Sequence, residues 1–542
     1  ASTFAADVMQ SIEYHVGLAT VGAALQGGIA TITAFDPNFV GIATVNDLLC
    51  WDDPAMGQYP TYARVTAVNA NTVEVVGVTT VTGFVNGGLS TSTASTEVQD
   101  LKILETQLQT SSDDTLYTVL PKTSTSNVDL TDASITIRKT FTVNITDNKL
   151  ASAVSCGSSE TFLNFDEERY TLIRSDGQTE SLTDGDLIIT DGTSLQIYNL
   201  GANDVGATLV TSVEKLKPKA KEKLKNRVNS LIVSKSDTPG SGIGTTTLND
   251  GLDYGTGLYP YGTRVQDRTI SLNVPDIIEI HGIFESADTG AASAPKMTLS
   301  SLTSASTTTA ELIIGELMIG QVTGAVAIVA EKVSNSSSQI VYIYKNDITF
   351  KEGEVVAFQE SNVEGSVTTL DTPSFDISSE YTFNTGQQGT YYNYGTLKRK
   401  NELGSPVKQL KVYFMSAYYA STDTGDITTV NSYDNFNYAT EIQDVNNVFN
   451  ADILDIRPRV SDYTVAESSR SPLEFYGRSF NAAGQSAGNV LASDETIKIN
   501  YSNYLGRIDR IFITKDGKFQ IMYGTPSERP EKPSSVDDAL EV

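Results

Sequence analysis

Short runs of β-branched and aromatic residues, separated by turn residues, recur along this chain of 542 residues. Many of the turns contain Asn-Gly or Asp-Gly, pairs that tolerate the positive φ angles of a type I′ turn between antiparallel strands. After Asp516-Gly517, for example, Phe519, Ile521 and Tyr523 alternate with other residues, as they would on one face of a hairpin strand. The pattern predicts a mainly β protein of several β-sandwich or β-barrel-like domains with few short helices. The turn pairs begin at Asn86, Asp176, Asp184, Asp191, Asp250 and Asp516.

Helical spacing is confined to two segments near the N-terminus. Leucines and a valine between Thr96 and Leu108 recur at the spacing of one helix face, so a short helix is predicted near 96–108, and a second over 3–15. The uncharged stretch from Val16 to Phe35 is long enough to span a bilayer. Its four Gly, three Thr and one Gln favour two buried strands joined near Gln26, so no membrane insertion is expected.

Composition excludes several classes of function. The 38 Lys and Arg against 66 Asp and Glu give a net charge of −28, which repels phosphate, so no nucleic-acid partner is expected. Two cysteines, Cys50 and Cys156, cannot form a disulfide framework. With only His15 and His281 in the chain, histidine-dependent metal sites and catalytic triads have few candidate residues. We expect no metal and no cofactor.

Changes in composition predict four parts of the chain. A basic, Lys-rich tract closes the second part, and a Gly-, Ser- and Thr-rich linker follows it. Inside the fourth part, Gly315–Gly324 resembles Gly353–Gly365, which suits two hairpins of one small barrel or sandwich. The predicted parts are 1–115, an N-terminal β domain with a short helix near 96–108; 116–237, a second β domain ending in the Lys-rich segment; 238–300 together with 371–542, a larger β-rich domain; and 301–370, a small inserted β domain.

Motifs that resemble catalytic or ligand-binding sites each have a simpler explanation. The segment Gly484–Gly488 matches a nucleophile elbow, but no buried strand precedes it and no His follows it. The segment Gly240–Thr247 lacks the Lys of a phosphate-binding loop. Asp184, Asp186 and Asp191 lack the twelve-residue pattern of a calcium-binding hand and sit in turn pairs. We therefore assign no catalytic, cofactor-binding or metal-binding residues.

The carboxylates of Asp166, Glu167 and Glu168 raise the alternative of glycan cleavage, which needs two acids flanking a glycosidic bond. In a chain with 66 acidic residues, neighbouring carboxylates also arise by chance. Arg169 follows directly, which favours an exposed and partly self-neutralised turn.

Two groups of residues are candidates for an interface. Alternate lysines in the basic tract would share one face of a strand, either as a solvated edge that blocks strand pairing or as a contact with an acidic neighbour. Clustered tyrosines offer apolar area with a polar tip to a partner or a sugar, or else form cross-strand pairs in the core. The candidate interface residues are Lys217, Lys219, Lys221, Lys223, Tyr391, Tyr392 and Tyr394.

The C-terminal third carries a series of motifs. Residues Ala451–Tyr463 contain Asp-x-Arg-Pro-Arg, and Ser471–Phe480 begins with Ser-Pro and ends with Arg-Ser-Phe. Together with Tyr504–Arg510 and Asp516–Pro530, they resemble virion structural proteins of contractile-tailed (myovirus-type) phages, especially those that infect marine cyanobacteria. Where that family has Pro, this chain has Gly506.

Two earlier stretches add to the resemblance. Residues Ala133–Arg138 and Glu160–Arg174 are similar to a β module repeated across tail proteins of marine phages, and Gly315–Ala325 is similar to their small Gly-Glu/Thr-Gly-Ala modules. The family's chain continues past a segment like Asp537–Val542, so we expect the present sequence to be a truncated or partly ordered chain. No catalytic residues carry over from the family.

The resemblance implies a structural component of a phage virion, in the tail baseplate or tail-fibre attachment region, that acts by assembly and is not an enzyme. Its expected partners are other virion tail and baseplate proteins, further copies of itself in a homo-oligomer, and host surface glycan. It would be made in the cytoplasm of the host bacterium and located in the virion. The alternatives are a receptor-binding or glycan-cleaving tail spike or fibre protein and, third, a secreted bacterial adhesin.

Overall fold

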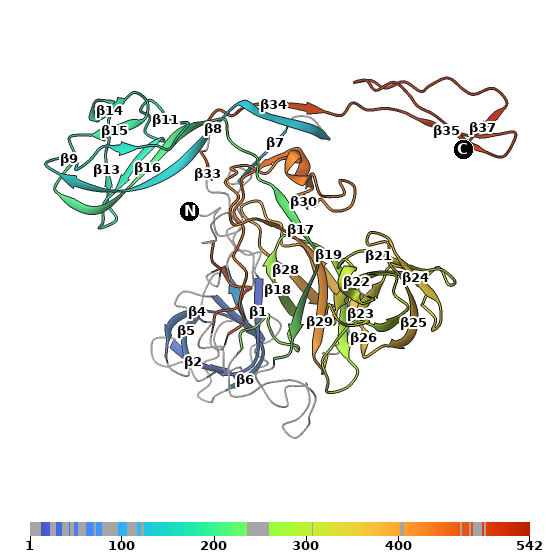
Figure 1. The fold of residues 1–542 in the computed structure, drawn as a ribbon. Coiled ribbons are helices and arrows are strands. Elements are labelled where there is room, and N and C mark those ends of the chain that lie inside the picture. Colours follow the sequence, from blue (N-terminus) through green and yellow to red (C-terminus); the bar gives the residue numbers. More distant parts are fainter. Residues whose placement is uncertain are drawn as a thin grey trace. The chain divides into compact units, whose positions relative to one another are not determined.

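The structure, a computed structural model, is mainly β, which confirms the predicted fold class (Figure 1). In the part of the chain that it describes, the helical segments are 3₁₀ turns of three or four residues, and no helix there is long and apolar enough to cross a membrane. The described residues are 12–21, 29–34, 43, 48–52, 61–69, 72–77, 96–105, 116–120, 124–235, 259–305, 307–400, 406–466, 469–475, 478–480, 490–492 and 495–542.

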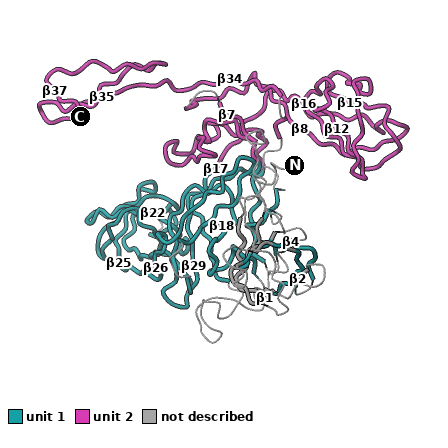
Figure 2. Tube along the Cα trace, turned by 180° about the vertical axis from the view of Figure 1, so that it is seen from behind, with its two compact units in different colours: residues 1–115, 224–421, 458–486 teal, residues 116–223, 422–457, 487–542 magenta. Residues whose placement is uncertain are grey.

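The chain folds into two compact units, and each is assembled from three separate stretches of sequence (Figure 2). Neither unit is therefore a continuous segment of the chain. Unit 1 comprises Ala1–Thr115, Leu224–Ser421 and Pro458–Ser486, and unit 2 comprises Leu116–Lys223, Thr422–Arg457 and Ala487–Val542.

Unit 1 begins with a closed barrel of six antiparallel strands in the order β1-β2-β5-β4-β3-β6. Alternation builds its core: Ala63 and Val65 are buried while Arg64 between them is exposed. The two strands predicted between Val16 and Phe35 are present and pair with each other. The strands are β1 (Ile12–Val21), β2 (Ile29–Ala34), β3 (Leu48–Asp52), β4 (Thr61–Val68), β5 (Val73–Gly77) and β6 (Thr96–Glu105).

The helix predicted near 96–108 is wrong, because residues Thr96–Glu105 form strand β6. β6 pairs with β1 on one side and with β3 on the other, so the backbone finds its hydrogen-bond partners by closing the barrel. Tertiary pairing of this kind overrides a helical spacing of apolar residues. For the helix predicted over 3–15, residues 12–15 lie in β1 and the rest lie outside the described residues.

Two further sheets of unit 1 share one apolar core that includes Ile270, Ile283, Leu397 and Val412. One has the strand order β17-β29-β19-β26, and the other has the order β18-β28-β27. The strands are β17 (Lys223–Val233), β18 (Thr269–Pro275), β19 (Ile277–Ser286), β26 (Ser374–Asp376), β27 (Tyr381–Asn384), β28 (Tyr394–Arg399) and β29 (Leu410–Tyr419).

A second closed barrel, with strand order β20-β23-β22-β21-β24-β25, lies between β19 and β26 in the sequence. All six strands are antiparallel to their neighbours, and the interior is filled by buried apolar side chains such as Met297, Val329 and Phe358. The strands are β20 (Lys296–Ser300), β21 (Leu317–Gly320), β22 (Val326–Lys332), β23 (Gln339–Tyr344), β24 (Val355–Phe358) and β25 (Glu364–Asp371).

The sequence echo detected in this region corresponds to two matching halves of the second barrel. The Gly315 N–H donates to the Val329 carbonyl at 2.7 Å, and the Gly353 N–H donates to the Val367 carbonyl at 2.7 Å. Both glycines have a φ of 85°, a conformation that side chains with a Cβ rarely adopt. The halves meet where β21 and β24 pair, so the predicted two hairpins of one small barrel are confirmed.

Unit 2 is built around an eight-stranded sheet in which the long strand β8 pairs with β16. A three-stranded sheet, β10-β15-β14, contributes Leu195 and Ile197 to the same core. The strands of both sheets are β8 (Thr125–Thr146), β9 (Lys149–Leu150), β10 (Val154–Ser155), β11 (Glu160–Phe162), β12 (Tyr170–Ile173), β13 (Thr179–Glu180), β14 (Leu187–Thr190), β15 (Ser194–Ile197), β16 (Asp204–Leu216), β33 (Val490–Leu491) and β34 (Lys498–Asn503).

The last strands of the chain form a separate three-stranded sheet of unit 2, called here the C-terminal sheet, in the order β36-β35-β37. The predicted hairpin at Asp516-Gly517 joins its first two strands, and Gly517 has a φ of 72°. Two strand pairs complete the unit. The remaining strands are β7 (Tyr117–Val119), β30 (Asp444–Val445), β31 (Val448–Phe449), β32 (Ile453–Asp455), β35 (Arg510–Thr514), β36 (Phe519–Met522) and β37 (Ala539–Glu541).

Candidate functional site

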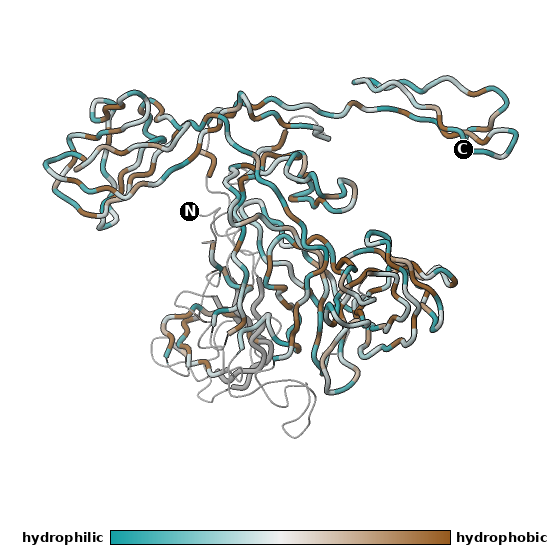
Figure 3. Tube along the Cα trace, in the orientation of Figure 1, coloured by the Kyte–Doolittle hydropathy of each residue, from teal (hydrophilic) through white to brown (hydrophobic). Residues whose placement is uncertain are grey.

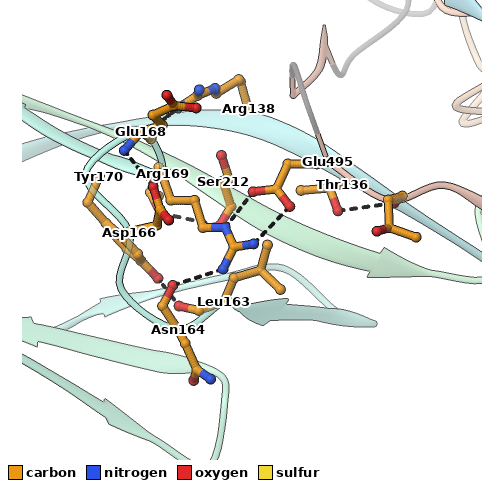
Figure 4. A network of polar contacts seen from close by, with 12 residues as sticks. Thr136, Arg138, Leu163, Asn164, Asp166, Glu168, Arg169, Tyr170, Ser212 and Glu495 are labelled. Carbon is orange, nitrogen blue, oxygen red and sulfur yellow. Dashed lines mark hydrogen bonds and ion pairs between the residues drawn. The ribbon is translucent and has the colours of Figure 1, made fainter. Parts of the chain in front are cut away.

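The acidic cluster considered for glycan cleavage, Asp166 to Glu168, is an exposed turn. The residue that follows it, Arg169, binds a part of the chain that is distant in sequence. The Arg169 guanidinium forms two hydrogen bonds with the Glu495 carboxylate, through Nε to Oε1 and through Nη2 to Oε2 at 3.0 Å (Figure 4). Its Nη1 donates to the Asn164 carbonyl at 3.2 Å. The hydrogen bond to Glu495 raises the pKa of Arg169.

The acids of this turn are exposed and take part in local hydrogen bonds. The carboxylate of Asp166 accepts the Glu168 N–H at 3.0 Å, and the Glu168 carbonyl accepts from Arg138 Nη1 at 2.6 Å (Figure 4). Near the Arg169–Glu495 ion pair, the Ala492 N–H donates to the Thr136 carbonyl at 2.9 Å. The turn is exposed, as predicted, but its arginine pairs with Glu495 rather than with the acids of the turn, and these contacts hold the chain after residue 490 against β8.

Two of the other motifs, Gly240–Thr247 and Gly484–Gly488, lie entirely outside the described part of the chain. At the predicted turn, the Asp186 carboxylate accepts both the N–H and the hydroxyl of Thr183, and these bonds lower the pKa of Asp186. Within the described ranges, no three His, Cys, Asp or Glu side chains gather in a way that could hold a metal ion.

The structure separates the four candidate lysines into two pairs. Lys217 and Lys219 are exposed, whereas Lys221 and Lys223 are buried in unit 2. The Lys223 ammonium lies 4.9 Å from the centre of the Tyr433 ring, a cation–π contact that compensates part of its desolvation. An interface role remains a prediction for the exposed pair.

The acidic neighbour of the basic tract belongs to the same chain. Lys215 Nζ binds the Asp426 carboxylate at 2.5 Å, and the Lys219 N–H donates to the second oxygen of Asp426 at 2.9 Å. The Lys221 N–H then donates to the Ile427 carbonyl at 2.8 Å. Part of the tract is thus used inside unit 2 and is not offered to a partner.

The candidate tyrosines lie in the interior of unit 1, so the core alternative is the one that the structure supports. Tyr392 and Tyr394 are almost fully buried, and Tyr391 is buried as well. The Tyr391 ring meets Phe480 edge-on at 5.6 Å, and the Tyr394 hydroxyl donates to the Ser461 carbonyl at 2.8 Å. These contacts satisfy both the apolar rings and the polar tip of Tyr394.

The Asp-x-Arg-Pro-Arg motif is also internal. The Asp455 and Arg457 side chains are fully buried and form an ion pair at 2.6 Å. Arg459 donates to the Ala417 carbonyl at 2.6 Å and lies over the ring of Tyr419 at 5.3 Å. Buried charges need this degree of pairing, because desolvation is costly.

The Ser-Pro and Arg-Ser-Phe motifs likewise make internal contacts, in unit 1. The Ser471 hydroxyl donates to the Tyr261 carbonyl at 2.6 Å, and Leu473 packs into the core of the first barrel. Arg478 donates to the Leu473 carbonyl at 2.9 Å and to the Tyr391 hydroxyl at 3.1 Å. The motif residues that carry the family resemblance thus hold the chain to itself.

An exposed apolar surface, not selected from the sequence, lies on one side of the C-terminal sheet. Cross-strand partners share a face, so the pairs Ile511–Ile521 and Ile513–Phe519 lie on the same side of the sheet. Phe519 is 71% exposed, and Ile511 and Ile521 are each about half exposed. We call this surface the C-terminal apolar face, and it consists of Ile511, Ile513, Phe519, Ile521, Tyr523, Leu540 and Val542. Figure 3 colours the trace of the chain by hydropathy, with hydrophobic and hydrophilic stretches in the segment that ends at the C-terminus.

On the opposite side of the same sheet, the central Phe512 is covered by its own chain. Phe512 is 1% exposed, and the Arg510 guanidinium lies 4.9 Å from the centre of its ring. Arg510 also donates to the Pro533 carbonyl at 2.9 Å and forms a bidentate ion pair with Glu541. The central apolar side chain on this side of the sheet is therefore buried, whereas the apolar side chains on the other side are exposed. The signal in the sequence was the matching parity of the apolar residues on both sides of Asp516-Gly517.

Comparisons of this chain with known protein families, with curated proteins and with solved structures find no match. Functional inference therefore depends on the residues and contacts described above. Among them, the C-terminal apolar face is a surface whose apolar side chains the described contacts leave exposed.

Proposed function

We propose that this protein is a structural component of a phage virion, in the tail baseplate or tail-fibre attachment region, and that it acts by assembly and not by catalysis. The motif resemblance in the C-terminal third supplies the location. The mechanism is mechanical: closed barrels and sheets act as stiff modules, and an exposed surface joins them to neighbours in the tail.

One observation carries the proposal, namely the exposure of the C-terminal apolar face. Phe519, Leu540 and Val542 each leave more than two thirds of their surface open to solvent. Free proteins rarely expose large contiguous apolar patches, and such patches mark interaction sites. A virion protein that is covered on assembly would need such a surface.

The contacts of the charged candidates agree with this role. Arg169 and its acidic turn hold residues after 490 in place, and Asp455 is engaged with Arg457. Their arrangement stabilises the fold, and a glycan-cleaving pair of acids would instead need to face a sugar across a water-filled gap.

The test is to locate the protein in purified phage particles. We expect quantitative mass spectrometry to find it at a fixed copy number per particle, and a cryo-EM map of the tail to contain density for its two barrels. Particles that are infectious and intact without the protein would refute the proposal.

A matched test uses the encoding gene. Phe519→Lys on the apolar face should yield particles depleted of the protein, because burying an unpaired ammonium in an apolar interface is costly. The control is Val205→Lys, at a position of β16 that is 78% exposed and far from this sheet in the sequence. Normal incorporation of both variants would contradict the role assigned to the face.

A further inference from the structure

We infer that the C-terminal apolar face binds the same face of a second copy of this chain, so that two C-terminal sheets stack across a two-fold axis. The inference rests on the proposed function and names the partner of the surface on which that proposal depends. The composition of the face makes it complementary to itself, and the area and charge of the described residues are compatible with a second copy.

The face is chemically uniform, which makes it complementary to itself. Its central strand β35 presents Ile511 and Ile513, and each is flanked on a neighbouring strand by an apolar partner, as Ile513 is by Leu540. In a two-fold interface the same patch serves both subunits, so a patch without charged residues meets no like charge when it faces its copy. Stacked β-sheets pack about 10 Å apart through interdigitated side chains of this kind.

The exposed area suits a stable dimer. Six residues of the face are between 45% and 72% exposed. At roughly 150–200 Å² for a fully exposed aromatic side chain, and less for an aliphatic one, they present on the order of 500–700 Å². A standard interface buries about 800 Å² per partner, so the face and its rim come close to the size required.

The charge of this region permits two copies to approach. The whole chain carries a net charge of −28, which opposes self-association of most of its surface. Residues 498–542, however, contain seven basic and seven acidic side chains, so this segment has no net charge. Self-association is electrostatically least costly where the apolar face lies.

The edge of the face has the polar rim of an interface. The Arg507 guanidinium lies 4.8 Å from the centre of the Tyr523 ring and forms an ion pair with Asp509 at 2.8 Å. Interfaces commonly combine an apolar centre with tyrosine, arginine and a solvated polar rim.

The experiment is sedimentation equilibrium of the full chain over a range of concentrations. We expect the wild type to reach twice the monomer mass. Phe519→Lys on β36 and, as a second variant, Leu540→Lys on β37 should each raise the dissociation constant at least about tenfold, as expected for residues central to an interface. Val205→Lys should leave the dissociation constant unchanged.

Circular dichroism will show whether each variant keeps its β structure, and the large exposure of Phe519 and Leu540 favours this. A wild type that stays monomeric at high micromolar concentration would overturn the inference. So would variants that are folded and dimerise as tightly as the wild type.

The failure of this inference is distinguishable from the failure of the proposed function. If particles contain the protein but another tail protein covers the face in the cryo-EM map, the dimer is wrong and the virion role stands. If the chain dimerises through this face but is absent from particles, the dimer stands and the virion role is wrong.

Discussion

The second barrel and the C-terminal sheet are both antiparallel β structures, yet they differ in how far they bury their own apolar side chains. In the barrel each of the six strands pairs on both sides, and the core is filled from within. The C-terminal sheet has three strands and two edges, and Phe512 is the one buried apolar residue of the fully described segment 498–542. A closed barrel is complete by itself, whereas a small open sheet needs a cover.

The difference also appears in how the two regions use acids. Glu316 and Glu354 occupy matching places in the two halves of the barrel and are buried. Each accepts backbone N–H groups: Glu316 from Ile313 at 2.6 Å, and Glu354 from Lys351 at 2.5 Å. Glu541 of the C-terminal sheet is exposed and pairs with an arginine side chain. In the barrel, the acidic side chains accept hydrogen bonds from the backbone of tight turns. In the C-terminal sheet, the acidic side chain of Glu541 lies on the surface.

The largest effect is expected from the same residue type in the two environments. Phe358→Ala in the barrel core should lower the free energy of opening of the barrel by about 4 kcal/mol, because it removes buried contacts and leaves a cavity. Hydrogen exchange measured by mass spectrometry on peptides from residues 296–371 reports this energy for the barrel alone.

The matched control is Phe519→Ala, which should change the stability of the C-terminal sheet in the monomer by less than about 0.5 kcal/mol, because that ring is mostly solvated. Similar losses for both variants would show that the C-terminal apolar face is already covered within one chain.

A smaller effect should come from the buried acids. Glu316→Ala and Glu354→Ala should each destabilise the barrel by about 3 kcal/mol, because backbone donors lose a charged acceptor in a buried site. Thermal unfolding and hydrogen exchange of the barrel peptides measure the loss. The near-equality of the two values tests the correspondence of the two halves.

Glu352→Ala, at an exposed position two residues before Glu354, is the control and should change barrel stability little. A large loss for one buried acid and none for the other would break the correspondence between the halves.

The smallest expected effect is a dependence of the free energy of unfolding on pH. The neighbouring His281, whose Nδ1 lies 3.6 Å from the carboxylate, and the Lys345 ammonium, at 2.6 Å, lower the pKa of Glu279, on β19, from 4.5 to about 2. The lowered pKa means that this stabilisation is complete above about pH 4.5 and is lost as the pH falls towards 2. Since the carboxylate is half exposed, the loss should be about 1 kcal/mol.

Unfolding of wild type and Glu279→Gln between pH 2 and 6 measures this dependence, which the variant should flatten. Glu541→Gln in the C-terminal sheet should leave the pH profile unchanged in moderate salt, because that ion pair is solvated. If both variants flatten the pH dependence of unfolding equally, the two regions do not differ in how their acids contribute to stability.

Local signals in the sequence predicted those features that depend on a few neighbouring residues. The Asp516-Gly517 hairpin and the repeated Gly-Glu turns at Gly315 and Gly353 follow from backbone conformations that few residues adopt. The helix near 96–108 failed because the pairing of β6 with β1 and β3 is long-range and leaves no local trace.

The candidate site was harder to predict than the fold. Whether Lys223 or Tyr392 lies inside or outside depends on contacts with residues far away in the sequence, such as Tyr433 and Arg459. The sequence placed Phe519, Ile521 and Tyr523 on one face, but it could not show how far the described residues leave these side chains exposed. Exposure is a property of the whole fold, and so it could be recognised only from the structure.

The ends of the second barrel lie next to each other. Lys296 on β20 is the cross-strand partner of Asp371 on β25, and just outside them Ser286 pairs with Ser374. The polypeptide therefore departs from and rejoins the flanking β19–β26 pair at almost the same point. Genetic recombination at this point could remove the barrel, or exchange it for another module, without redirecting the strands on either side.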